Sequence, residues 1–212
     1  MSVLDYILRH PQEVLDLTLE HLWLVGLSTL LAVAVGLPLG ILLTRRPAWS
    51  RAVLGGASVM QTVPSLALFG FLLTLPWLRQ QRADYLAILA LTLYALLPII
   101  RNTHAGISGV DPAVVEAGRG MGLTGRQLLV QVELPLAAGV ILAGVRVAAV
   151  ISVGLATIAA AIGAGGLGEY IFRGVAMVND QLILAGVLPA ALLALAADFG
   201  LGLVEKRLRP AG

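Results

Sequence analysis

The sequence predicts an all-α integral membrane protein with five transmembrane helices. Hydrophobic residues make up 58% of the 212 residues and charged residues only 12%, whereas a soluble domain carries about 25% charged residues. The mean hydropathy is +0.93. Five apolar runs approach or exceed the length of about 17–25 residues that crosses a bilayer core. With so few charges the chain cannot cover a soluble surface, which excludes a soluble enzyme, a disordered protein and a basic nucleic-acid binder.

The five predicted spans together form one transmembrane domain, residues 21–205. They cover residues 22–44, 52–75, 85–100 (with one further turn allowed), 136–162 and 182–204. Four contain an internal proline (Pro38, Pro64, Pro98 and Pro189), which membrane helices tolerate because neighbouring helices satisfy the freed backbone groups. Gly36 and Gly40 have the spacing of small residues that brings two membrane helices close together, so we expect them to pack against a neighbouring helix.

The two ends of the chain differ from this apolar domain. Residues 1–20 mix charged and apolar side chains, which is typical of an amphipathic segment at the membrane interface. An N-terminal extension of the first helix explains the same residues equally well. The start has no basic stretch before an apolar core, so we expect no cleavable signal peptide. Residues 206–212 form a short basic tail that is a weak lipid anchor at best.

The distribution of lysine and arginine predicts the orientation, because these residues are enriched in cytoplasmic loops. If the loops after the first, third and fifth spans share one side, that side carries nine of them: Arg45, Arg46, Arg51, Arg101, Arg119, Arg126, Lys206, Arg207 and Arg209. The other side carries four: Arg9, Arg79, Arg82 and Arg173. We therefore predict an outside N-terminus, a cytoplasmic C-terminus and a cytoplasmic loop between the third and fourth spans.

This third loop is the longest polar connection in the chain and is predicted to contain two short helices. Asp111-Pro112 is a helix-start signal, because aspartate caps free N–H groups and proline fits the first helical position. We expect that helix to fail over the glycines at 118, 120 and 122. Thr124 and Gln127 have the spacing of a capping box for a second helix. We expect this helix to end near Leu134-Pro135, where Pro135 opens the fourth span.

A motif in this loop makes the chain resemble a known family. Glu116-Ala117-Gly118, then Gly122, then Val132-Glu133-Leu134-Pro135 resembles the EAA motif (E-A-A-x3-G-x9-I-x-L-P) of ABC-importer permease subunits. The third position is Gly118 in place of alanine, and Val132 replaces isoleucine. The resemblance implies a type I importer fold, like that of methionine-importer permeases, with residues 111–135 as a coupling loop that docks on a cytoplasmic ATPase.

The same resemblance implies particular roles for the motif residues and a set of partners. Six residues would form the ATPase-coupling site: Glu116, Ala117, Gly118, Gly122, Leu134 and Pro135. The family assembles two permease subunits, alike or different, above two ATPase subunits, with a separate substrate-binding protein outside. ATP and Mg²⁺ would then be bound by the ATPase, and this chain lacks the G-x-x-x-x-G-K-[ST] phosphate loop. We expect no cofactor, no catalytic residue and no nucleic acid partner for this chain.

Other segments resemble the permeases of osmoprotectant importers in bacterial inner membranes. They are residues 61–68, 91–103, 109–112 and 162–168. These importers take up quaternary amines such as glycine betaine, carnitine and choline. A permease for another small solute, such as methionine, stays open, and so does a stand-alone channel or scaffold. The spacing of the EAA motif argues against the last of these.

A glycine-rich turn follows the fourth span. Gly163, Gly165 and Gly168 match the G-x-G-x-x-G pattern of dinucleotide sites, but that site needs a preceding strand. We therefore interpret these glycines, with Gly166, as a sharp turn that packs closely. The family resemblance implies that this turn faces the external binding protein.

Two charges lie within the apolar spans. Arg146 and Asp198 differ in predicted depth by only about 6 Å at 1.5 Å per residue, and charges in a bilayer are costly unless they are paired. We predict that they pair inside the bundle. Either they line the solute path or a gate, or they serve structure alone, with snorkelling to the interface included in the second interpretation.

Metal binding and catalysis find no support in the sequence. The chain has no cysteine, so it has neither a disulfide framework nor a thiolate metal site. Its histidines, His10, His21 and His104, lack the spacing of metal ligands.

Overall fold

The structure is a computed structural model that describes residues 3–78 and 81–208. Every regular element in these residues is helical, in the order α1 (Val3–Arg9), α2 (Pro11–Arg45), α3 (Pro47–Thr62), α4 (Ser65–Thr74), α5 (Ala83–Ser108), α6 (Pro112–Gly120), α7 (Gly125–Leu128), the π-helical η1 (Leu129–Glu133), α8 (Leu134–Ala159), the 3-10 helix η2 (Ala160–Ile162), α9 (Gly168–Ala176) and α10 (Asp180–Leu208). Arg79 and Arg209, which entered the count of loop charges, lie outside these residues.

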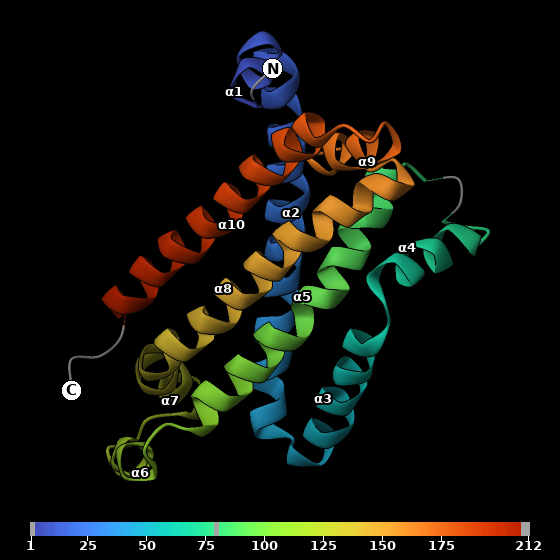
Figure 1. The fold of residues 1–212 in the computed structure, drawn as a ribbon. Helices are drawn as coiled ribbons and strands as arrows, with labels where there is room; N and C mark the ends of the chain where they lie inside the picture. Colours follow the sequence, from blue (N-terminus) through green and yellow to red (C-terminus); the bar gives the residue numbers. More distant parts are fainter. Residues whose placement is uncertain (1–2, 79–80, 209–212) are drawn as a thin grey trace.

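Helices α2, α5 and α8 form the centre of the molecule. α5 packs on both of the others, while α10 lies along α8 (Figure 1). The expected packing role of Gly36 and Gly40 is confirmed. A Cβ atom on Gly40 would lie 2.6 Å from Thr103 Cβ, and one on Gly36 would lie 3.0 Å from Ile99 Cγ2. Side chains larger than hydrogen would therefore push α2 away from α5.

Among the described residues, four helices or helical runs are each long and apolar enough to cross a membrane. They are Pro11–Arg45, Ala83–Ser108, Gly125–Ile162 and Asp180–Leu208, and they contain four of the five predicted spans. Prolines 38, 98 and 189 lie inside them without ending them. Figure 1 shows α6 and α7 at one end of the molecule and α1 and α9 at the other. We call these the loop end and the turn end.

The second predicted span, residues 52–75, is not a continuous helix. It divides into α3 and α4, which meet at an angle of 96°. Proline lacks an N–H group and disfavours a helical conformation in the residue before it, and Val63 is accordingly extended. Tyr94 of α5 holds the break, because its hydroxyl donates to Val63 O and its carbonyl accepts from Gln61 Nε2 at 3.1 Å. Pro64 therefore breaks the helix, contrary to expectation, while α3 and α4 together remain long and apolar enough to count as one bent span.

The N-terminal segment divides between two helices. Residues 11–20 extend the first membrane helix, since α2 begins at Pro11, whereas α1 is separate. α1 contacts the turn end through Tyr6, whose ring meets that of Tyr170 edge-on with centroids 5.9 Å apart. Arg173 of α9 donates to Glu13 at 2.7 Å, and this bond to the carboxylate raises the pKa of Arg173.

Candidate functional site

Helix α6 projects from the loop end and begins as the sequence predicts. Asp111 Oδ1 accepts a hydrogen bond from Ala113 N at 2.8 Å, and Pro112 is the first helical residue. The expectation that the helix fails at Gly118 is wrong, because α6 continues to Gly120. Gly118 is buried, and a Cβ atom there would lie 2.8 Å from Leu128 Cδ1. The small residue therefore lets α6 pack against α7.

Gly122 ends α6 with a Schellman motif, in which a residue with positive φ closes the last turn. Its φ is +83°. Leu123 N donates to Gly118 O at 3.2 Å, and Gly122 N donates to Arg119 O at 2.9 Å. Glycine suits this position because it has no Cβ to clash in the left-handed region.

The surface of α6 is exposed around Glu116. Glu116 and Ala117 are exposed, and no hydrogen bond or ion pair holds Glu116 within residues 3–78 and 81–208. Two apolar side chains are also exposed on this segment, Val114 at 42% and Met121 at 75%. The sequence motif did not single out these two.

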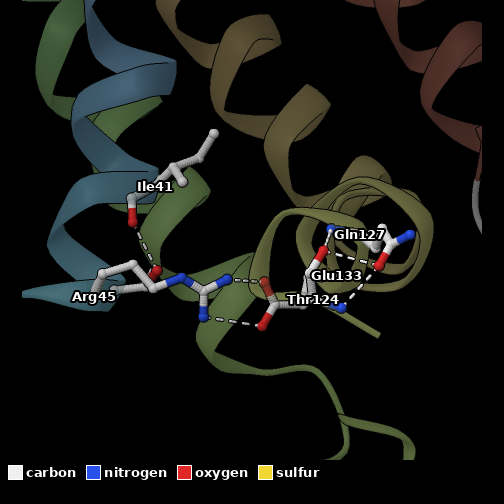
Figure 2. Close-up of polar contacts among 6 residues, drawn as sticks. Ile41, Arg45, Thr124, Gln127 and Glu133 are labelled. Carbon is white, nitrogen blue, oxygen red and sulfur yellow. Dashed lines mark hydrogen bonds and ion pairs between the residues drawn. The ribbon is translucent and has the colours of Figure 1, made fainter. Parts of the chain in front are cut away.

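The second loop helix does not end at Leu134-Pro135, so that expectation is wrong. α7, η1 and α8 run on as one helical segment, Gly125–Ile162. The capping box at its start is confirmed. Thr124 Oγ1 accepts from Gln127 N at 3.4 Å, and Gln127 Oε1 accepts from Thr124 N at 2.8 Å (Figure 2). The helix continues through Pro135, which lies in the first turn of α8 directly after the π-helical turn η1. Proline is tolerated at such a position because the N–H group that it lacks is not required there. Leu134 is half-buried and Pro135 is exposed.

An ion pair joins this segment to the end of α2. Arg45 reaches Glu133 with both terminal nitrogens, Nη1 to Oε1 at 3.1 Å and Nη2 to Oε2 (Figure 2). Glu133 is only 4% exposed. The two residues line a pocket of about 240 Å³ together with Glu116 and Arg119 of α6. In the sequence Arg45 is only a loop charge and Glu133 only part of a motif, since nothing in the chain order brings α2 to the loop.

The glycine-rich turn lies at the turn end, on the far side of the molecule from α6 (Figure 1). Gly163, Gly165 and Gly166 have φ values of 80°, 83° and 79°. Gly168 has ordinary φ but is tightly packed, and a Cβ atom there would lie 2.0 Å from Thr157 O. Glu20 of α2 binds the turn by accepting from Gly166 N at 2.9 Å.

Arg146 and Asp198 lie together, as the depth argument predicts. Arg146 Nε donates to Asp198 Oδ1 at 2.6 Å, and Nη2 donates to Oδ2 at 3.1 Å. A third residue, Glu205, accepts from Arg146 Nη1 at 3.3 Å and is buried. The side chains of Arg146 and Asp198 are 36% and 37% exposed. The predicted pairing is confirmed, but its expected place inside the bundle is wrong, because the pair lies at the surface of this chain between α8 and α10.

A second Schellman motif ends α9, and it lacks the usual glycine. Asn179 N donates to Gly174 O at 2.8 Å, and Val178 N donates to Val175 O at 3.3 Å. Val178 occupies the left-handed position with φ 52° and is 88% exposed. A β-branched residue in this conformation is strained by about 1–2 kcal/mol.

Opposite substitutions at these two motifs are expected to shift stability in opposite directions. Val178→Gly should raise the free energy of unfolding by about 1 kcal/mol, because it relieves backbone strain without removing buried surface. Gly122→Ala should lower it by a similar amount, since alanine is strained at positive φ. Thermal unfolding of the purified chain in mild detergent measures both. Equal melting temperatures for Val178→Gly and wild type would show that the backbone of Val178 is not strained.

Three comparisons with known proteins agree with this geometry. Residues 36–210 match the family model described as "Binding-protein-dependent transport system inner membrane component". The chain is 45% identical over 209 residues to the carnitine transport permease protein OpuCB of Listeria monocytogenes, covering 99% of this chain and 94% of that protein. It is 41% identical over 213 residues to the osmoprotectant import permease protein OsmW of Salmonella typhimurium, covering 100% and 99%.

The fold also matches a solved transporter. An inward-facing structure of the MetNI methionine ABC transporter superposes with a TM-score of 0.83 at 22% identity, covering 94% of this chain and 98% of that one. This similarity establishes the type I permease fold. Together with the family match over most of the chain, it shows that the chain belongs to the binding-protein-dependent transport system inner membrane components, the permease subunits of ABC importers.

Proposed function

We propose that this chain is the permease subunit of an importer for quaternary-amine osmoprotectants of the glycine betaine, carnitine and choline type. The support is the naming of its relatives, which are a carnitine permease and an osmoprotectant permease at 45% and 41% identity over nearly the whole chain. A methionine importer has weaker support, because that similarity is one of fold at 22% identity.

The structural observation that supports an ATP-driven importer is the loop between α5 and α8. α6 projects from the end of the bundle with Glu116 and Ala117 exposed and with Glu116 free of partners among the described residues. A charged side chain on a projecting helix, flanked by exposed Val114 and Met121, has the chemistry of a docking element. We propose that this element docks on the cytoplasmic ATPase, the subunit that would bind ATP and Mg²⁺.

The proposed assembly has two permease subunits, the same or different, around one solute path. The loop end then faces the cytoplasm, with the N-terminus outside. ATP binding would close the ATPase dimer and move the loop, and the bundle would open outward to receive solute from the binding protein. The turn containing Gly163, Gly165, Gly166 and Gly168 would face that protein. After hydrolysis the bundle would return to the inward-facing state.

Charge reversal on α6 tests the docking. We expect Glu116→Lys to abolish co-purification of the ATPase from native membranes in mild detergent, because a lysine repels the basic or polar groups that receive the carboxylate. Mass spectrometry identifies the proteins that accompany the tagged chain. Asp16→Lys is the matched control, since Asp16 is an exposed carboxylate on the far part of α2. Absence of any ATPase with the wild-type chain would contradict the proposal and favour a channel or scaffold.

Uptake by reconstituted vesicles tests the solute class. Vesicles holding the complete transporter, with its binding protein outside and ATP inside, are expected to take up labelled glycine betaine, carnitine or choline saturably. Each unlabelled quaternary amine should compete with the labelled one. Saturable uptake of methionine alone would exclude the osmoprotectant assignment while leaving the importer class intact.

A further inference from the structure

The ion pair at the loop end is built around a buried carboxylate. Glu133 is 4% exposed, and Arg45 meets both of its oxygens. Paired N–H donors on one carboxylate fix the relative orientation of the two groups as well as their separation. Arg45 is the last residue of α2 and Glu133 the last residue of η1. The pair therefore fixes the end of the first membrane helix to the point where the loop enters α8.

Stability alone gives little reason to place charges here. Replacing a buried ion pair by packed apolar side chains is often neutral or stabilising, because a buried charge loses its hydration. Here the Glu133 carboxylate bears most of that cost, since the Arg45 side chain is 41% exposed. The value of such a pair lies in geometry, since each charge strongly disfavours any arrangement that separates it from the other. Glu133 also ends the single π-helical turn in residues 3–78 and 81–208, and π-helical turns are frequent at functional sites.

The part of α2 nearer the turn end also contacts α8 and the turn that follows it. His21 Nε2 lies 3.2 Å from Val153 O of α8, and Glu20 accepts from Gly166 N in the turn that follows α8 at 2.9 Å. α2 therefore has polar contacts to α8 or to the turns that flank it at Arg45, its last residue, and at Glu20 and His21 in its N-terminal third. A displacement of the Glu133 junction that preserves the ion pair must also displace the end of α2.

We propose that the Arg45–Glu133 pair makes α2 a second transmitter of the loop's motion, alongside α8. Arg45 and Glu133 are positioning residues in this scheme, because neither contacts the ATPase or the solute. The scheme rests on the proposed function, since it deepens the role of the coupling loop. It predicts that the pair stays closed throughout the transport cycle and that its loss separates ATP hydrolysis from solute movement.

The test uses the complete transporter in vesicles, with labelled glycine betaine, carnitine or choline as the probe. For Arg45→Gln and Glu133→Gln, solute taken up per ATP hydrolysed should fall about tenfold, within the range that mutations along coupling networks produce. ATPase co-purification should persist. The charge exchange Arg45→Glu with Glu133→Arg should restore most of the ratio. Arg46→Gln is the matched control, because Arg46 is exposed and lies over the Trp49 ring at 5.9 Å from its centroid.

The outcomes separate this inference from the proposed function. An unchanged ratio in both single variants would overturn it, and so would a parallel loss of uptake and hydrolysis that the charge exchange does not repair. If wild type carries no ATPase at all, the proposed function itself fails. If wild type transports and Glu116→Lys loses the ATPase while the Arg45 and Glu133 variants keep normal ratios, only the further inference fails.

A covalent link tests whether the pair must open. The sequence has no cysteine, so Arg45→Cys with Glu133→Cys introduces the only two thiols of this chain. A short thiol-reactive bifunctional reagent then joins the two positions in place of the ion pair. We expect the linked transporter to regain the uptake per ATP that the unlinked double variant lacks. Loss of all uptake on linking, with uptake intact before linking, would show that the pair opens during the cycle and would overturn the proposal.

Discussion

Gly168→Ala is expected to prevent the turn end from folding. A Cβ atom at this position would lie 2.0 Å from Thr157 O and 2.8 Å from Ala160 Cβ. The first of these atoms belongs to the backbone of α8, so no side-chain rotation can relieve the contact. Overpacking of a core typically costs about 1–3 kcal/mol, and a backbone clash belongs above that range. We expect little folded chain after extraction, as measured by size-exclusion chromatography of a fluorescent fusion.

Two other glycines supply graded controls for this substitution. Gly154→Ala adds the same methyl group within α8, where nothing lies within 4 Å of the new atom, so the yield should match wild type or exceed it. Gly163→Ala also meets no atom, but its φ of +80° strains alanine by about 1 kcal/mol. The yield of folded Gly163→Ala should therefore fall between the yields of Gly154→Ala and Gly168→Ala. A normal yield of folded Gly168→Ala would show that the turn and α8 are further apart than described.

Arg146→Gln is expected to reduce the yield of folded chain severalfold more than Asp198→Asn. Arg146 is the shared donor for Asp198 and Glu205, so its removal leaves Asp198, within the apolar part of α10, without its two-bonded guanidinium partner. Asp198→Asn leaves Arg146 its contact with Glu205 at 3.3 Å. Intramembrane charges are costly when they lack an opposite charge. The yield of monodisperse protein in mild detergent shows which of the two variants loses more folded chain.

Arg207→Gln serves as the control for the loss of an arginine, because Arg207 is exposed near the end of α10. Uptake by those variants that fold then distinguishes the two interpretations of the pair. Folded Asp198→Asn with normal uptake would indicate a structural role, and folded Asp198→Asn without uptake would indicate a place in the solute path or gate. An equal yield of Arg146→Gln and wild type would contradict the three-residue cluster.

The sequence was informative wherever a local rule decides the structure. Apolar runs located four of the spans, and the caps at Asp111 and Thr124 form as their side chains require. Local rules were insufficient where neighbours decide. Proline is tolerated at Pro38 and Pro98 but breaks the helix at Pro64, where Tyr94 of another helix bonds to Gln61 and Val63 on the α3 side of the break. No pattern in residues 52–75 contains that contact.

The candidate site divides in the same way. The EAA-like motif identified α6 and the surface around Glu116 from consecutive residues. It could not reveal that Gly118 faces Leu128, nor that Glu133 is bound by Arg45, which lies 88 positions away in the chain. The Arg146–Asp198 pair was predictable from depth, whereas Glu205 was not, because it lies near the end of α10 where a charge is ordinary. Contacts between distant segments are set by packing, which one sequence does not display.

The continuous helix Gly125–Ile162 has a mechanical consequence. Near its middle, Gly144 brings α8 so close to α5 that a Cβ atom would lie 2.7 Å from Pro98 O. We therefore take this contact as the point about which α8 would tilt. A rod that tilts about its midpoint moves its two ends in opposite directions by similar amounts. An inward swing of the loop end would therefore appear as an outward swing of the glycine-rich turn. In the proposed importer, this geometry would open the bundle at one end as it closes it at the other.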